Sequence, residues 1–258
     1  MTDFIKKTFR FYSIKRRHHE FKSQTPIPVS RWLEIRDEER QRYRDSEDLL
    51  SPIRFFGSEN GYKGIHAELK PIFEGVELGT WALDSRTIDY FWKVLDEKKP
   101  KTILEFGSGS STCAFAAWVK SRDVDCHIIS IDQNQSEAEK TMSRLKGFGL
   151  VDCSKVLVMP QRTEDDRYDI DVMRIETEFG GKTIDMVFAD GPAGRFGCRD
   201  STLPSVIELL SKDAIWFLHD SLRDSELEIA DKWATFKGVT CKGVIPFGNG
   251  LAVGSYTP

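Results

Sequence analysis

The feature that most constrains the fold of this chain is a regular alternation of short apolar runs with helical segments, which begins at Lys101. An uninterrupted apolar run suits a strand that is buried on both sides, and strands that alternate with helices form βαβ units. The pattern therefore predicts an α/β fold whose mostly parallel sheet is covered on both faces. The predicted strands cover residues 102–106, 127–131, 155–159, 184–189 and 214–218, and a helix is expected after the fourth of them, at 203–210.

The last twenty residues break this rhythm. Two strand-like segments flank Pro246 and the sequence Gly248-Asn249-Gly250, which favours a turn. We therefore predict an antiparallel strand pair at the end of the chain. The expected fold is a Rossmann-like, mostly parallel sheet with a closing antiparallel strand pair, plus an N-terminal helical extension.

The extension is predicted to take up the first 80 residues, where the alternation is absent. Residues 1–22 carry seven Lys or Arg and two Asp or Glu, so seven minus two gives a charge of +5, and aromatic residues lie between the basic ones. Such an arm is either solvated or in weak contact with an anionic surface. A charged helix, capped by Ser30, is predicted from about Arg31 to Leu50. We expect two units, residues 1–80 and residues 81–258.

Composition limits the partners of the chain. Its 258 residues are 40% apolar, enough for one large core with or without an appendage. The 37 Lys and Arg against 41 Asp and Glu leave a net charge of −4, so no nucleic-acid partner is expected. No apolar run approaches the ~20 residues that span a bilayer, the N-terminus lacks the apolar stretch of a secretory signal, and the five cysteines are scattered. We expect a cytoplasmic protein with reduced thiols.

Candidate ligand-binding residues lie around the ends of the first two strands, since an open parallel sheet binds ligands beyond the carboxyl ends of its strands. Glu105 precedes a turn that contains Gly107 and Gly109. Glycines allow a tight turn and a close approach of a ligand, and the helix that follows presents free N–H groups to an anion. The alternative is a tight turn that binds nothing. Asp132 ends the second strand, where it either accepts hydrogen bonds from ribose hydroxyls or caps the next helix.

Candidate catalytic residues follow the fourth and fifth strands. They are Asp190, His219 and Asp220, and His219 is the favoured general base because the pKa of histidine lies near neutrality. Alternatively, the two aspartates cap loops and the histidine packs as a neutral ring. Arg195 and Arg199 lie in the glycine-rich loop after Asp190, where they either bind an anionic substrate or are solvated.

Taken together, these segments resemble the class I S-adenosylmethionine-dependent methyltransferases. The sequence ILEFGSGSST (Ile103–Thr112) is similar to the first motif of that family, an acidic residue two positions before the first of two glycines. DMVFADGP (Asp185–Pro192) and AIWFLHD (Ala214–Asp220) are similar to the ends of its fourth and fifth strands. The resemblance implies S-adenosylmethionine as the cofactor. The resemblance implies Glu105 near the methionine amino group, directly or through water, Gly107 and Gly109 near the methionine moiety, Asp132 at the ribose, and Gln161–Glu164 near the adenine. Ser110 is a further candidate for cofactor binding.

A looser resemblance connects the three candidate catalytic residues with the magnesium site of catechol-type O-methyltransferases. The present chain has His219-Asp220 where that site has Asp-Asn. Histidine is a poor ligand for magnesium, which prefers oxygen, and so no metal is expected.

The expected function is methyl transfer to oxygen or nitrogen of a small-molecule or glycan acceptor. One alternative is an NAD(P)-dependent oxidoreductase. It is disfavoured by the closing strand pair and by Thr112, which replaces the third glycine of the dinucleotide-binding motif. The other alternative is a nucleotide-binding protein that kept the fold and lost catalysis.

Overall fold

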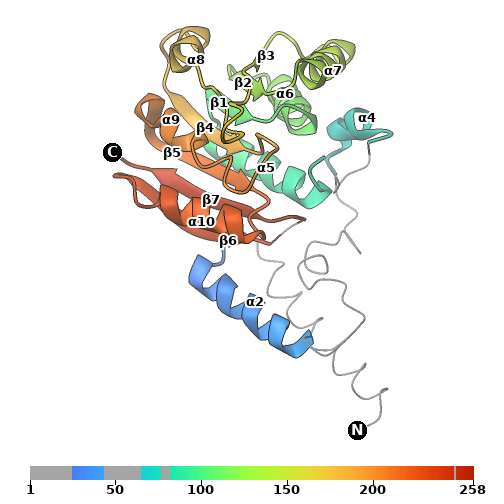
Figure 1. The fold of residues 1–258 in the computed structure, drawn as a ribbon. Coiled ribbons are helices and arrows are strands. Elements are labelled where there is room, and N and C mark those ends of the chain that lie inside the picture. Colours follow the sequence, from blue (N-terminus) through green and yellow to red (C-terminus); the bar gives the residue numbers. More distant parts are fainter. Residues whose placement is uncertain (1–24, 44–64, 77–81, 247) are drawn as a thin grey trace.

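The computed structural model describes residues 25–43, 65–76, 82–246 and 248–258 of the chain. Within them, one sheet of seven strands forms the middle layer, in the order β3-β2-β1-β4-β5-β7-β6 (Figure 1). The strands are β1 (Thr102–Phe106), β2 (His127–Asp132), β3 (Ser154–Val158), β4 (Ile184–Ala189), β5 (Leu210–His219), β6 (Val239–Ile245) and β7 (Leu251–Tyr256).

The pairing of the strands confirms the predicted sheet. The first five strands run parallel to their neighbours, whereas β7 pairs antiparallel with both β5 and β6. The chain reverses its strand order between β1 and β4, because β1 lies between β2 and β4. Such a switch point leaves a crevice at the carboxyl ends of the two strands.

Helices cover both faces of the sheet. They are α2 (Val29–Tyr43), α4 (Lys70–Phe73), α5 (Ser85–Lys98), α6 (Ser110–Arg122), α7 (Gln135–Gly147), α8 (Val172–Glu178), α9 (Thr202–Ser205) and α10 (Asp224–Trp233). Helices α4 to α7 contribute to the apolar core on one face, and α2, α8, α9 and α10 contribute to the core on the other (Figure 1). The two cores explain why the strands read as continuous apolar runs.

Strand β4 illustrates this arrangement. Met186 and Phe188 face the core under α5 and α6, while Val187 and Ala189 face the core under α9 and α10. All four side chains are fully buried. Alternate residues of a strand point to opposite faces, so an apolar residue is needed at every position of a strand covered on both sides.

The N-terminal helix differs from its prediction at its start. It begins at Val29, and the N–H of Trp32 donates to the carbonyl of Pro28 at 2.9 Å, so Ser30 lies inside the helix and does not cap it. The described part of the helix ends at Tyr43. Trp32 is 1% exposed and packs with the core beside β6. Ile27 adds a short antiparallel bridge to Val244 at the outer edge of the sheet.

The predicted helix at 203–210 is also wrong in extent. The structure has only the four residues of α9, then a 3-10 turn over Ile207–Leu209, and β5 starts at Leu210, four residues earlier than predicted. The basic arm at 1–22 and the proposed boundary at residue 81 lie outside the described residues. In the part of the chain that the structure describes, no helix has the length and apolar character needed to cross a membrane.

Candidate active site

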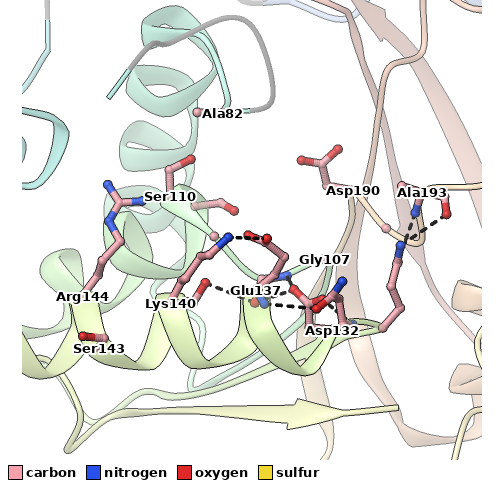
Figure 2. Close-up of a pocket in the computed structure, with 17 residues that line it drawn as sticks. Ala82, Gly107, Ser110, Asp132, Glu137, Lys140, Ser143, Arg144, Asp190 and Ala193 are labelled. Carbon is pink, nitrogen blue, oxygen red and sulfur yellow. Dashed lines mark hydrogen bonds and ion pairs between the residues drawn. The ribbon is translucent and has the colours of Figure 1, made fainter. Parts of the chain in front are cut away.

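A cavity of about 920 Å³ lies at the carboxyl ends of β1, β2 and β4, where the strand order reverses. Figure 2 shows Asp132 and Asp190 extending from the strand ends, with side chains of α6 and α7 on the other side. Five residues predicted from the sequence line the cavity: Gly107, Gly109, Ser110, Asp132 and Asp190.

The turn after β1 is built by backbone contact between two glycines. Gly107 has φ +96°, and a Cβ atom on it would lie 2.9 Å from the backbone nitrogen of Gly191. The N–H of Gly191 and the N–H of Asp190 both donate to the carbonyl of Phe106, at 2.7 and 2.8 Å. A side chain at position 107 would separate the ends of β1 and β4, so the glycine is required by the structure with or without a ligand.

Glu105 lies beneath this turn and does not line the cavity. The side chain is fully buried, and its Oε2 accepts hydrogen bonds from the hydroxyls of Thr112, at 2.5 Å, and Ser130. Its Oε1 has no hydrogen-bond partner among the described residues. Burial raises the pKa of Glu105 to about 7, against the opposing effect of the hydroxyls. Glu105 therefore cannot contact a methionine amino group directly from the cavity wall. The same bond explains why the third glycine of the dinucleotide-binding motif is absent, since Thr112 uses its hydroxyl to bind Glu105.

Asp132 holds the glycine turn in place. Its Oδ2 accepts from the N–H and the hydroxyl of Ser108, at 3.1 and 2.6 Å, and its Oδ1 accepts from the N–H of Asn134 at 2.9 Å. The helix cap is Asn134, whose side chain accepts from the N–H groups of Ser136 and Glu137. The interpretation of Asp132 as the cap of the next helix is therefore wrong, and its carboxylate lies at the cavity wall.

Helix α7 supplies a wall of the cavity that the sequence interpretation missed. Glu137, Lys140, Thr141 and Arg144 line the cavity, and Lys140 binds Glu137 at 2.7 Å (Figure 2). Their spacing of three, four and seven residues places them on one face of a helix. The polar face of this helix could have been recognised in the sequence. Whether it points toward the site depends on how α7 packs on β3.

A second cavity of about 620 Å³ lies next to the first, and Asp190 and Ala193 line both. It is bounded by the loop after β4 and by the end of β5, with Arg199, His219 and Asp220 in its wall. The three candidate catalytic residues thus meet where the two cavities adjoin.

The imidazole of His219 pairs with Asp190. Its Nδ1 lies 2.7 Å from Oδ1 of Asp190 and 3.7 Å from Oδ1 of Asp220, and its Nε2 is buried with no hydrogen-bond partner among the described residues. Burial opposes the charged ring, but the two carboxylates outweigh it and raise the pKa of His219 above the usual 6.5. The pKa of Asp190 is lowered, because the charges of His219 and Arg199 outweigh its burial. A carboxylate on Nδ1 leaves Nε2 as the nitrogen that can accept a proton.

The two arginines of the loop after β4 are in different surroundings. The side chain of Arg195 is 62% exposed, and its guanidinium binds Asp166 at 3.3 Å and the carbonyl of Glu164 at 2.8 Å. Arg199 is 6% exposed and lies among carboxylates, so it is not a solvated loop charge. Both line the second cavity, but they do not form a pair of free cations over it.

The loop itself is tied down at its end. Asp200 binds Arg167 at 2.5 and 2.7 Å and Lys232 at 2.6 Å, and its carbonyl accepts from the indole of Trp233 at 2.8 Å. These contacts join the loop to the segment after β3 and to α10. In its central part, the side chain of Phe196 is 73% exposed.

The segment Gln161–Glu164 does not line the first cavity. The side-chain amide of Gln161 donates to the carbonyl of Ala193 at 2.9 Å, and Arg162 binds Asp165 at 2.5 Å. The implied place near an adenine therefore has no support from the lining of the cavity.

Oxygen and nitrogen atoms of Asp190, His219 and Asp220 lie within 4.8 Å of one another, which is close enough for a shared metal ion. The surroundings do not fit one. Nη1 of Arg199 lies 3.0 Å from Oδ2 of Asp220 and 3.7 Å from Oδ1 of Asp190, and Arg223 binds the same oxygen of Asp220 at 2.9 Å. The carboxylates already have cationic partners, and a divalent ion would be repelled by them.

No family model and no curated protein matches this sequence. Solved structures do match the fold. The Podospora anserina methyltransferase PaMTH1, with S-adenosylhomocysteine bound, is 16% identical and has a TM-score of 0.59, over 78% of this chain and 92% of that one. The O-methyltransferase TomG from Streptomyces achromogenes, in complex with S-adenosylmethionine, is 17% identical with a TM-score of 0.56, over 78% and 94% of the two chains. An O-methyltransferase from Bacillus cereus, with S-adenosylhomocysteine, is 11% identical with a TM-score of 0.57, over 77% and 94%.

The likeness establishes the fold. The chain has the Rossmann-like fold of class I methyltransferases, in agreement with the motifs and with the predicted, mostly parallel sheet that ends in an antiparallel strand pair. At such low identity the shared fold does not by itself carry the reaction, which has to be argued from the residues of the site.

Proposed function

We propose that the protein is an S-adenosylmethionine-dependent methyltransferase. The observation that carries the proposal is the cavity at the switch point of a methyltransferase fold, with the Gly107 turn and Asp132 at its wall. The structural neighbours with S-adenosylmethionine or S-adenosylhomocysteine bound support the choice of cofactor.

In this proposal the cofactor lies along the first cavity. Gly107, Gly109 and Ser110 pass beside its methionine moiety, and Asp132 accepts from the ribose hydroxyls while it holds Ser108. Glu105 acts one layer deeper, through the turn that it supports from below. The hydroxyl of Thr112, which stands in place of a glycine, is bound to Glu105, and β7 runs antiparallel to β5. Both observations argue against NAD as the cofactor.

The acceptor occupies the second cavity, which adjoins the first at Asp190. The bound cofactor supplies a methyl group that is already activated, so the chief task of the protein is to align a nucleophile with it. Asp190 orients the ring of His219 through Nδ1, and Nε2 takes the proton of an oxygen or nitrogen nucleophile. Since Nε2 is covered, binding of the acceptor has to expose it. Asp220 adds a second negative charge beside the ring of His219. A small molecule or a glycan unit fits a cavity of about 620 Å³.

Calorimetry tests the choice of cofactor. We expect S-adenosylhomocysteine to bind and NAD not to bind. Asp132→Asn should weaken S-adenosylhomocysteine binding by roughly 1.5–3 kcal/mol, because a charged acceptor of hydrogen bonds is lost. Two variants serve as controls. Asp171→Asn changes the cap of α8, outside the cavity wall, and Ser108→Ala removes a bond of Asp132 while it keeps the carboxylate. Tight NAD binding, or unchanged affinity in folded Asp132→Asn, would contradict the assignment.

A methyl-transfer screen separates the enzyme from a non-catalytic binding protein with the same fold. The protein is incubated with labelled S-adenosylmethionine and pooled metabolites and glycans, and transfer of label is measured. We expect at least one labelled product that His219→Ala reduces strongly. Binding of the cofactor with no product in any pool would favour the non-catalytic alternative.

A further inference from the structure

Arg199 is a buried cation in the wall of the second cavity, and it comes from a loop. It is 6% exposed, although it follows a segment with three glycines. A buried cation is costly unless it is paired and hydrogen-bonded. Its burial therefore indicates that the surroundings are built to hold a positive charge.

The guanidinium of Arg199 contacts two carboxylates and two backbone carbonyl oxygens. Nη1 lies 3.0 Å from Oδ2 of Asp220 and 3.7 Å from Oδ1 of Asp190, and it also donates to the carbonyl of His219 at 3.3 Å. Nε donates to the carbonyl of Pro192 at 3.3 Å. One nitrogen thus bridges the two carboxylates, and the backbone of the strand ends fixes the plane of the group.

The carboxylates of this cluster already have cationic partners. Arg199 lies against both Asp190 and Asp220, whereas the more exposed Arg223 binds Asp220 alone. A divalent ion among these carboxylates would face a guanidinium within a few ångströms.

We propose that the guanidinium of Arg199 is the resident cation of this site. It takes the role that a divalent metal ion would have between Asp190 and Asp220. By holding Asp190, it also fixes the carboxylate that orients the ring of His219. Arg199 is therefore a positioning residue that acts through Asp190 and Asp220, and the chain needs no metal at this cluster. The inference rests on the proposed function only where it places the cluster beside the reacting groups.

Binding of Mn²⁺, followed by electron paramagnetic resonance of the free ion, tests the proposal without any acceptor or cofactor. The wild-type protein should leave the signal of the free ion unchanged. Arg199→Met removes the cation but keeps an apolar side chain, so Asp190, His219 and Asp220 become an unbalanced set of ligands. This variant should bind one Mn²⁺ per chain, roughly tenfold or more tightly than the wild type. The added change Asp220→Asn should abolish the binding.

Two matched variants serve as controls. Arg199→Lys keeps a positive charge at the same place and should behave as the wild type. Arg223→Met removes an arginine that binds the same Asp220 oxygen but whose side chain is 60% exposed, and it should gain no Mn²⁺. Circular dichroism establishes that each variant is folded.

Binding of one Mn²⁺ by the wild type that Asp190→Asn removes would overturn the proposal, and so would a folded Arg199→Met without any gain. If Arg199→Met does not fold, the wild type and Arg199→Lys still decide, because Mn²⁺ binding by either contradicts a resident cation. None of these measurements of Mn²⁺ binding requires catalytic turnover. A failure of the methyltransferase proposal would instead appear as absent cofactor binding or absent methyl transfer, with the Mn²⁺ results unchanged.

Discussion

Glu105 and His219 are both buried ionisable groups, yet their surroundings favour different charges. Glu105 meets hydroxyls and an adjacent glycine turn, so burial dominates and its pKa rises to about 7. His219 meets two carboxylates, which favour the imidazolium and raise its pKa despite burial. At the scale of single residues, these two environments lead to separate predictions for the pH dependence of the rate and of the stability.

His219 as the general base leads to a prediction on the rate. A base must be unprotonated, so the single-turnover rate should rise with pH through a pKa above 6.5, the usual value. His219→Ala should lose roughly 10²–10⁴-fold in rate while S-adenosylhomocysteine affinity stays nearly constant. Asp190→Asn should move the inflection to lower pH, because the carboxylate that raises the pKa is gone. The rates are measured with an acceptor from the screen and corrected for folded protein.

A structural histidine would behave otherwise. In that case His219→Ala lowers the thermal stability, and the rate of the folded fraction stays close to that of the parent. Such a result would leave Asp190 or Asp220 as the base, or alignment of the reactants alone.

Glu105 leads to a prediction on stability. Its pKa is raised from 4.5 to about 7, so between these values the folded state holds a proton that the unfolded state has lost. The free energy of unfolding should therefore fall as pH rises, by roughly 3 kcal/mol in total. Glu105→Gln cannot ionise and should lack this fall. Urea unfolding of the two proteins at pH 5 and pH 8, without cofactor, measures the difference.

The control for this experiment is Glu137→Gln on the exposed part of α7. Its curve should stay parallel to that of the wild type. Parallel curves for Glu105→Gln as well would contradict the prediction, because they would show that Glu105 is ionised in the folded protein at neutral pH.

At the scale of elements, the site depends on how closely β1 and β4 approach each other. The turn after β1 and the turn after β4 touch through Gly107 and Gly191. The same contact sets the distance between the Asp132 side of the cavity and Asp190. One backbone contact therefore joins the two halves of the site.

Gly107→Ala should disturb this contact. The added methyl group meets the nitrogen of Gly191 at 2.9 Å, and φ +96° is unfavourable for alanine. We expect a loss of roughly 1–3 kcal/mol in stability and a lower affinity for S-adenosylhomocysteine. Gly147→Ala is the matched control, since Gly147 is the last residue of α7 and an added Cβ meets nothing within 4 Å. It should be neutral or slightly stabilising. Equal effects of the two changes would contradict the close contact of the turns.

At the scale of the whole molecule, we expect the N-terminal helix to be less stable than the centre of the sheet. Helix α2 lies beside β6 at the edge of the sheet (Figure 1). Among the side chains of this helix that the structure describes, Trp32 and Ile35 are buried. Strands β1 and β4 lie at the centre, between the two cores. Local openings take place where few apolar contacts hold an element.

Hydrogen exchange in low denaturant should reveal this difference. The amides of α2 should exchange through openings of lower free energy than the amides of β1 and β4. Trp32→Ala removes a side chain that is 1% exposed. The free energy of opening of α2 should fall by roughly 3–5 kcal/mol, or its amides should lose protection altogether. Trp118→Ala, which removes a buried side chain of α6 from the core on the other face, should instead speed exchange across the sheet. Uniform protection of α2 and the central strands would contradict a separate opening.

The loop from Gly191 to Asp200 contains three glycines and two arginines, and we predict that it becomes ordered over the acceptor. Asp200 and Arg199 hold its end, and Arg195 binds Asp166 and Glu164, so closure of the part around Phe196 would have to break the contacts of Arg195. Hydrogen exchange with cofactor and acceptor bound would locate such a change.

Much of the fold could be predicted from the sequence, because its signals are local. Each strand from Thr102 to Ala189 is a short apolar run within one or two residues of its predicted bounds, and the glycine turn after β1 and the closing strand pair follow from turn chemistry. Two helices depart from their predicted bounds, and in both cases a nearby proline is the cause. A helix after β4 is cut short around Pro204, and α2 starts before Ser30 because Pro28 already accepts its first bond.

The partners of the charged residues were decided by the tertiary structure alone. Asp190 and His219 are 29 positions apart, and Arg199 reaches Asp220 from a loop whose glycines gave no hint of burial. Neither the bond of Asp132 to Ser108 nor the wall formed by α7 can be read from spacing. Hydrophobic periodicity repeats over a few neighbours, and so one stretch of sequence contains it. A buried ion pair depends instead on where distant loops are brought by the packing of the sheet, and its charge is tolerated only where those loops meet.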